Sequence, residues 1–207
     1  MQANRQHGFT LVELAIVLVV IGLITGMAFK GRDLIDGAKI KNAQAQYNKV
    51  ATAFNVYHEK YGSFPGDGWS AAPGTAVTGS TGTRNGLLDS AIETAAALTV
   101  LQNGNILTLA DTQSALGQAW TISDSSAAAV AHFDTNTNYL TAGGIGSNAV
   151  DARYTCQLDR IMDDGAPDSG IVRSSANRGT TAAGDYDNSV DCWNRSGLVS
   201  LGIRILP

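Results

Sequence analysis

An apolar run of 21 residues near the N-terminus, Phe9–Phe29, constrains this chain more than any other feature of its sequence. Apart from one carboxylate, Glu13, the run holds only apolar residues, glycine and threonine. As an α-helix that rises about 1.5 Å per residue, it would be roughly 30 Å long, which is enough to cross the hydrocarbon layer of a membrane. A charge in such a segment costs about 2.5–3.5 kcal/mol on insertion scales, so Glu13 is a candidate functional residue that needs a partner.

The residues before Glu13 have the pattern of a processing signal. A short polar leader, residues 1–8, contains one basic side chain, Arg5, and ends in Gly8; it is followed by Phe-Thr-Leu-x-Glu and the apolar run. This pattern resembles the N-terminal signal of type IV prepilins and of the pseudopilins of type II secretion. The resemblance covers only the N-terminal part of the chain. It implies that a prepilin peptidase cleaves between Gly8 and Phe9 and methylates the new amine of Phe9.

A secretory signal and a plain membrane anchor are the alternatives for this segment. A secretory signal has an apolar core of about 7–15 residues followed by a small-x-small cleavage site. The run Phe9–Phe29 is longer, and Lys30–Asp33 offers no such site. A plain anchor fits the length, but it explains neither Glu13 nor the sharp boundary after Gly8.

The helix is expected to continue past the apolar run as an amphipathic segment, residues 30–62. Apolar residues recur there at alternating spacings of three and four, which predicts one helical stripe: Ile40, Ala43, Tyr47, Val50, Phe54, Tyr57 and Tyr61. Gly62 and Pro65 predict the end of the helix. The turn Pro65-Gly66-Asp67 resembles a segment common after the long helix of pseudopilin-like proteins. We expect the stripe to pack on a globular head formed by residues 63–207.

The head is predicted to contain a few short elements. Residues 71–86 are rich in glycine, serine and threonine and predict a surface loop. Ser90 and Glu93 form a capping-box pattern for a helix that reaches about Leu101 and ends near Gly104. Residues 119–141 predict short strands and loops.

A further helix and a strand are predicted in the C-terminal part. Residues 148–162 suit a helix with four apolar residues on one face: Val150, Tyr154, Leu158 and Ile161. Apolar residues alternate with other residues from Val199 to Ile205, which predicts a half-buried strand. The expected fold is therefore pilin-like α+β. A long N-terminal helix, with a transmembrane half at residues 9–29 and an amphipathic second half, packs on a small antiparallel sheet.

The chain has two cysteines, Cys156 and Cys192. Outside the cytoplasm, such a pair most simply forms one disulfide. A disulfide would close a loop of about 37 residues and so remove roughly 4 kcal/mol of conformational entropy from the unfolded chain. Two free buried thiols are an alternative. A metal pair is disfavoured because neither cysteine has a neighbouring cysteine or histidine.

Four aspartates form the only dense carboxylate cluster in the sequence: Asp159, Asp163, Asp164 and Asp168. Calcium takes several oxygen ligands, and the end of a helix followed by a loop can supply them. The spacing is not that of an EF-hand, and Asp-Asp-Gly also ends many helices, so no metal is assigned and Ca²⁺ stays an alternative. His7, His58 and His132 form no catalytic constellation, and we expect no enzyme activity.

The net charge of −4 argues against nucleic-acid binding, which typically needs a clustered basic face. We therefore expect a structural subunit of a type IV pilus-like filament, assembled through its N-terminal helix. Glu13 would pair with the Phe9 amine of a neighbouring subunit. The expected partners are other pilin or pseudopilin subunits, the prepilin peptidase and an inner-membrane assembly platform.

The alternatives are a type II secretion pseudopilin and, from another class, a membrane-anchored periplasmic binding module or enzyme. Arg5 precedes the span, whereas Lys30 and Arg32 follow it, so charge alone does not fix the orientation. The resemblance implies a cytoplasmic N-terminus and a single pass through the bacterial inner membrane, with a periplasmic head. After assembly the subunit would lie in a pilus at the cell surface or in a periplasmic pseudopilus.

Overall fold

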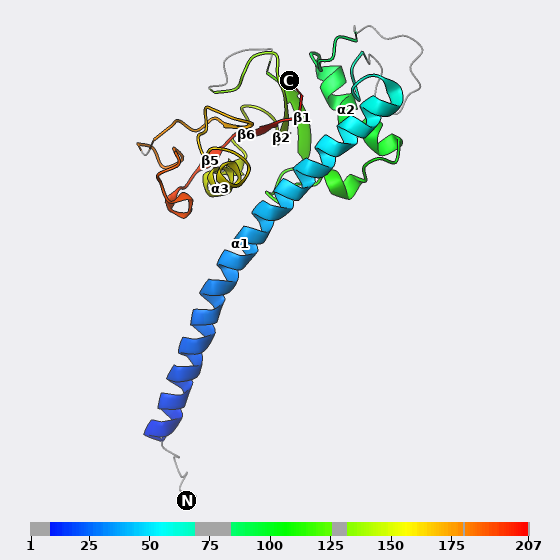
Figure 1. The fold of residues 1–207 in the computed structure, drawn as a ribbon. Coiled ribbons are helices and arrows are strands. Elements are labelled where there is room, and N and C mark those ends of the chain that lie inside the picture. The colour runs from blue at the N-terminus through cyan, green and yellow to red at the C-terminus, as the bar shows by residue number, and fades with distance from the viewer. Residues whose placement is uncertain (1–8, 69–83, 126–131, 180, 207) are drawn as a thin grey trace, which may run out of the picture. The chain divides into compact units, whose positions relative to one another are not determined.

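The computed structural model describes residues 9–68, 84–125, 132–179 and 181–206. The fold is α+β, as predicted: a long N-terminal helix and a small antiparallel sheet (Figure 1). The leader, residues 1–8, and most of the loop predicted at residues 71–86 lie outside the described residues. Contacts divide the chain into two units, Met1–Ala38 and Lys39–Pro207.

The long helix α1 is Leu11–Tyr61, so it begins two residues after the predicted start at Phe9. Its first part has no buried face, because every residue from 9 to 30 is exposed. A helix that is apolar on all sides is stable only where lipid or other protein surrounds it.

The second half of α1, within the unit that starts at Lys39, buries most of the predicted stripe. Five of its residues lie in the head core: Ile40, Ala43, Val50, Phe54 and Tyr57. Tyr47 is half-buried and its hydroxyl donates to the carbonyl oxygen of Arg204 at 2.9 Å. Tyr61 is 49% exposed, so the prediction was wrong there, because the helix ends at this residue.

The main sheet has the strand order β1-β2-β6-β4, and all neighbours are antiparallel. The strands are β1 (Trp120–Asp124), β2 (Asn138–Ala142), β4 (Val172–Ser174) and β6 (Leu201–Arg204). The strands predicted within residues 119–141 are thus present, whereas β4 was not predicted.

The predicted C-terminal strand is divided into two elements. Val199 belongs to β5 (Leu198–Val199), which pairs with β3 (Val150–Asp151) in a separate sheet. β6 is an inner strand of the main sheet, and Leu201, Gly202 and Ile203 are all buried, so the half-buried pattern was wrong. Gly202 alternates with apolar residues because a Cβ there would overlap the ring of Phe133.

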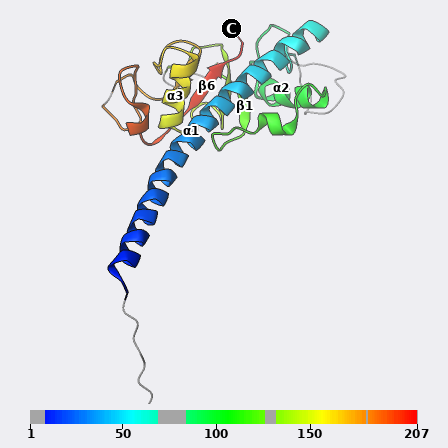
Figure 2. The same cartoon turned by 60° about the horizontal axis from the view of Figure 1, so that its bottom comes forward.

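Two shorter helices, α2 (Ala91–Asn103) and α3 (Ala152–Met162), lie on opposite sides of the second half of α1 (Figure 2). α2 begins with the predicted capping box: Ser90 Oγ accepts from the Glu93 backbone at 3.2 Å, and Glu93 Oε2 accepts from the Ser90 backbone at 3.2 Å. Gly104 is its C-cap. Two 3₁₀ helices, η1 (Leu109–Thr112) and η2 (Cys192–Asn194), were not predicted.

The predicted helix at residues 148–162 was wrong at its start and on one face. Residues 150 and 151 form β3, and Asp151 caps α3 by accepting from the Arg153 backbone at 2.9 Å. Ile161 is exposed, whereas Thr155 and Asp159 are buried. The buried face of α3 is therefore rotated from the one that the apolar residues suggest.

Candidate functional site

Phe9 is the first described residue, and its side chain is 81% exposed. Thr10 follows without regular structure, and α1 begins at Leu11. The predicted cleavage bond joins Gly8 to Phe9; Gly8 itself lies outside the described residues. The part of the predicted site that the structure describes is therefore the exposed start of α1.

Glu13 accepts hydrogen bonds from Thr10 in the same chain. Its Oε2 accepts from the Thr10 backbone at 2.9 Å and from the Thr10 hydroxyl at 2.8 Å. The Glu13 backbone donates to Thr10 Oγ1 at 3.3 Å. This is a capping box at the start of α1, which the Thr-x-x-Glu pattern would have indicated and which our sequence analysis missed. Among the described residues no ion pair forms at Glu13, so its charge has no counter-charge there.

Residues 3–29 match the family model of the prokaryotic N-terminal methylation motif. This segment is a prepilin-type signal. Such signals occur in type IV pilins and pseudopilins, and this one points to a structural subunit more than to an enzyme. The prepilin-type signal overlaps a helix that is long and apolar enough to cross a membrane. No curated protein and no solved structure matches the chain.

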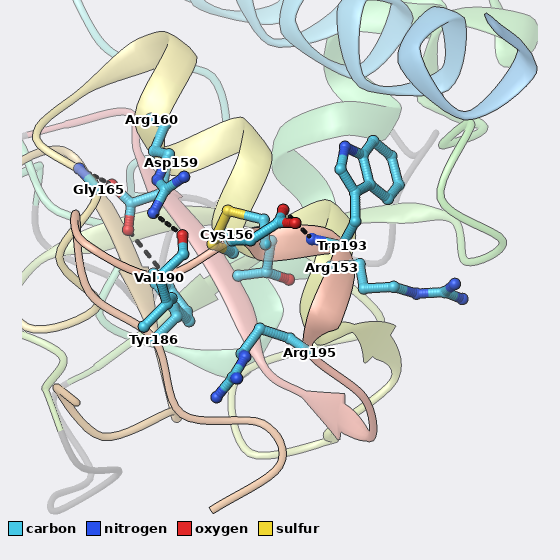
Figure 3. Close-up of a disulfide and its surroundings, with 12 residues drawn as sticks. Arg153, Cys156, Asp159, Arg160, Gly165, Tyr186, Val190, Trp193 and Arg195 are labelled. Atoms are coloured by element: carbon cyan, nitrogen blue, oxygen red, sulfur yellow. Dashed lines mark hydrogen bonds between the residues drawn. A yellow bond between two sulfur atoms is a disulfide. The ribbon is translucent and has the colours of Figure 1, made fainter. Parts of the chain in front are cut away.

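The head holds the second group of predicted site residues. Cys156 of α3 and Cys192 of η2 form a disulfide, with their Cα atoms 5.6 Å apart (Figure 3). Both cysteines are fully buried in a small cluster around β5 and α3. The disulfide therefore ties the last part of the chain to α3.

Asp159 lies one turn further along α3 and is fully buried. It accepts from the hydroxyl of Tyr186 at 2.9 Å and from the Gly165 backbone at 3.0 Å (Figure 3). Burial, with the nearby carboxylates of Asp163 and Asp164, raises the pKa of Asp159 to about 7. Burial also raises the pKa of Tyr186 well above its usual value.

Arg160 adds a further link between α3 and this region, because its guanidinium donates to the carbonyl oxygens of Asp187, at 2.9 Å, and Val190. The segment from Tyr186 to Cys192 is thus held to α3 at both ends and between them. Sequence reasoning found only the disulfide.

The structure brings together three of the four aspartates suggested for Ca²⁺. Oxygens of Asp159, Asp163 and Asp164 lie within 4.8 Å of one another. Asp168 is not in this group: Arg178 binds its carboxylate at 2.7 Å and holds its pKa below the usual value. Asp168 is therefore paired with an arginine ten residues away and lies apart from the other three carboxylates.

The three clustered carboxylates already accept bonds from their own chain. Asp163 accepts from the backbone of Val172 at 3.2 Å, and Asp164 accepts from the backbone of Ala166 at 3.0 Å. These bonds account for the cluster as the end of α3 and the edge of β4. Ca²⁺ binding stays an alternative that these contacts do not test.

The histidines make only packing and backbone contacts among the described residues. The ring of His58 lies 4.6 Å from that of Phe64, and His132 Nδ1 lies 3.3 Å from the carbonyl oxygen of Ser174. His7 lies outside the described residues. The structure does not bring His58 or His132 into a nucleophile–base arrangement.

Proposed function

We propose that this chain is a structural subunit of a type IV pilus-like filament. A prepilin peptidase cleaves it between Gly8 and Phe9 and methylates the Phe9 amine. The first half of α1 then holds the subunit in the bacterial inner membrane, with the head in the periplasm. An inner-membrane platform transfers the subunit into a filament that other pilin or pseudopilin subunits extend.

The observation that carries this proposal is the prepilin-type signal on a helical segment that has no buried face. Residues 3–29 contain the signal, and every side chain from residue 9 to residue 30 is exposed. Lipid can cover this surface before assembly, and the same segment of other subunits can cover it afterwards. A filament built through these helices satisfies both the signal and the apolar surface.

Glu13 would set the register between subunits. Among the described residues of the single chain it has hydrogen bonds from Thr10 but no counter-charge. Cleavage after Gly8 creates a positive amine on Phe9. A buried carboxylate is tolerable only where a positive group neutralises it, and the Phe9 amine of a neighbouring subunit supplies that group.

A pseudopilin of type II secretion is the second candidate, and the Pro65-Gly66-Asp67 turn favours it. The size of the head favours a pilin or a minor subunit. Both machines use the same signal, so the neighbouring genes separate them: a secretion cluster identifies the pseudopilin, and a retraction ATPase identifies the pilin.

Intact mass and N-terminal sequencing of the native protein test the proposal. A mature chain that begins with N-methyl-Phe9 supports a filament subunit. A chain that keeps its leader in cells that contain the peptidase would instead support a membrane-anchored binding module. Replacing Gly8 by a bulky residue should make the uncut precursor accumulate.

Glu13→Val tests the role of the carboxylate. The variant should enter the membrane at least as well as the wild type, because a costly charge is gone. It should be cleaved but should form no ordered filament. Thr25→Val is a matched control, because the Thr25 hydroxyl bonds only within the helix, to the Ile21 carbonyl at 2.8 Å. Normal filaments from the Glu13→Val protein expressed alone would contradict the proposed pairing.

A further inference from the structure

A pair of aromatic side chains lies on the surface of the head, beside the disulfide. Trp193 of η2 is 39% exposed, and its ring meets that of Tyr154 of α3 edge to face, with the ring centroids 6.5 Å apart. Each ring is close in the chain to one of the bonded cysteines, Cys192 or Cys156, so the disulfide holds the pair together. In Figure 3, Trp193 lies on the side of the disulfide away from Asp159.

Two basic side chains flank the ring of Tyr154. The ammonium group of Lys39 lies 5.3 Å from the ring centre and donates to the Tyr154 hydroxyl oxygen at 3.2 Å. The guanidinium of Arg153 lies 5.9 Å from the same centre and binds Asp151 at 2.7 Å. We call Lys39, Arg153, Tyr154 and Trp193 the aromatic-basic face. These four residue types collect where proteins meet lipid headgroups, because each joins an apolar body to a polar or charged end.

The aromatic-basic face is close to the membrane segment along the chain. Lys39 follows Phe29, the last residue of the apolar run, by ten positions, and a helix of that length keeps it within about 15 Å of the run. The headgroup layer adds roughly 5–8 Å on each side of the hydrocarbon. Lysine and arginine side chains extend toward this layer. Transmembrane helices also tilt by about 20° on average, and interfacial aromatic and basic residues set the direction of the tilt.

Charge identifies the occupant of this face. Residues 30–41 contain four basic and two acidic side chains, in a chain whose net charge is −4. Anionic headgroups attract a basic stretch of this kind beside a membrane span. An acidic protein would offer the opposite charge but not the apolar boundary that suits an indole ring. An anionic lipid surface offers both, and the helix keeps it within reach.

We propose that the aromatic-basic face docks on the membrane surface, against anionic phospholipid headgroups, while the first half of α1 spans the membrane. This inference rests on the proposed function, because it concerns the subunit before it enters a filament. Docking gives the waiting head one orientation on the membrane, and assembly releases the face.

Fluorescence of Trp193 in the full-length protein tests the docking. The protein is reconstituted into vesicles of phosphatidylcholine, with or without phosphatidylglycerol, that contain a lipid with a nitroxide on its headgroup. The chain has three tryptophans, so all proteins carry Trp69→Phe. The emission lost in a further Trp193→Phe variant is that of Trp193, since Trp120 remains in both and is only 2% exposed. We expect the nitroxide to quench Trp193 when phosphatidylglycerol is present, and high salt to reduce this quenching.

Two lysine variants form a matched control. Lys39 lies over Tyr154, and Lys60, near the end of α1, lies over Tyr61 with its ammonium group 5.0 Å from the ring centre. The two substitutions to glutamine therefore remove the same charge, but Lys60 is about 30 Å further along the helix. Lys39→Gln should lower the ratio of docked to undocked heads by about fivefold, and Lys60→Gln should stay within about twofold of the wild type. The salt dependence of the wild type tests the same attraction without a substitution at Lys39.

Carbonate extraction of the vesicles separates this inference from the proposed function. If carbonate removes the wild type, α1 does not span the membrane, and the proposed function fails and this inference with it. If the protein stays in the membrane while Trp193 is unquenched, or is equally quenched in both kinds of vesicle, only the docking is overturned. An equal loss in both lysine variants would also overturn it, because the effect would not follow the face. Emission that shifts to the blue only on filament assembly would assign the face to another subunit and overturn the docking.

Discussion

The two halves of α1 differ in what covers their apolar residues. In the second half, Ile40, Val50 and Phe54 are buried in the core of the head, each at most 2% exposed. In the first half, every side chain from residue 9 to residue 30 is exposed. One continuous helix thus combines a segment that buries side chains in its own head with a segment that buries none and depends on lipid or on other subunits for cover.

The polar contacts of the two halves show the same difference. In the second half, Gln46 accepts from Trp120 Nε1 at 2.9 Å, and Lys49 binds Asp111 at 2.6 Å. In the first half, the side-chain hydrogen bonds of Thr10, Glu13 and Thr25 stay within the helix or its cap. The second half is therefore specific for one partner, the head, whereas the first half presents a surface that several partners can cover in turn.

Matched alanine substitutions should separate the two halves most strongly. Phe54 is 1% exposed and Ile24 is 57% exposed. Phe54→Ala should lower the free energy of unfolding of the head by about 3–5 kcal/mol, because it leaves a cavity in the core. Ile24→Ala should leave that free energy unchanged. Denaturant unfolding of the full-length protein in detergent, followed by tryptophan fluorescence, measures both. Equal losses would show that the first half also packs on the head.

The disulfide should matter for the head alone. Cys156→Ala with Cys192→Ala should lower the free energy of unfolding by about 2–4 kcal/mol, because the unfolded chain regains the freedom of the closed loop. Membrane insertion should not change, since both cysteines and the buried cluster around them belong to the unit that starts at Lys39. Unfolding curves and carbonate extraction of membranes measure the two effects. Loss of insertion would contradict the independence of the two units.

Features that depend only on residues close together in the chain could be predicted from the sequence. The stripe of α1, the Ser90 capping box and the prepilin-type signal each depend on spacings within a few residues or turns. The start of α3 could not be predicted, because Val150 fits a helical stripe but pairs with Val199, 49 positions away. Strand β4 has only three residues, which is too short for a recognisable alternating pattern. It forms because it pairs with β6.

The head also contains contacts that depend on tertiary structure. Asp67, in the turn after α1, is 3% exposed and accepts from the backbones of Asn85 and Gly86, both at 3.1 Å. Glu93 accepts from the Gly68 backbone at 2.9 Å as well as capping α2. The sequence showed a turn and a capping box, but not that Asp67 binds the backbone of residues 85–86 or that Glu93 binds the turn at Gly68.

Asp159 should make the stability of the head depend on pH. Its pKa is about 7 in the folded protein, against an ordinary value of 3.8. Between these values the unfolded chain releases a proton that the folded head keeps. The stabilisation is therefore complete below about pH 4, falls by roughly 2–4 kcal/mol as the pH rises to about 7, and stays level above that.

Asp159→Asn should remove most of this dependence, since an amide does not ionise. Thermal unfolding of both proteins between pH 4 and pH 8 measures it, and the difference between them isolates Asp159 from Asp163, Asp164 and Tyr186. Parallel curves for the two proteins would contradict the raised pKa. Membrane insertion of the first half of α1 should be the same throughout.

The smallest expected effect is a difference in the free energy of unfolding between variants of two capping boxes, one in each unit. Thr10 and Glu13 cap α1, and Ser90 and Glu93 cap α2. The sequence pattern is the same, but Glu93 is 1% exposed whereas Glu13 is exposed. Ser90→Ala should lower the free energy of unfolding of the head by about 1 kcal/mol, because the backbone N–H of Glu93 loses its partner at the start of α2. Thr10→Ala should not change it, because the start of α1 is not part of that folding unit. Urea unfolding of the two variants beside the wild type measures the pair, and an equal loss in both would mean that the start of α1 is coupled to the head after all.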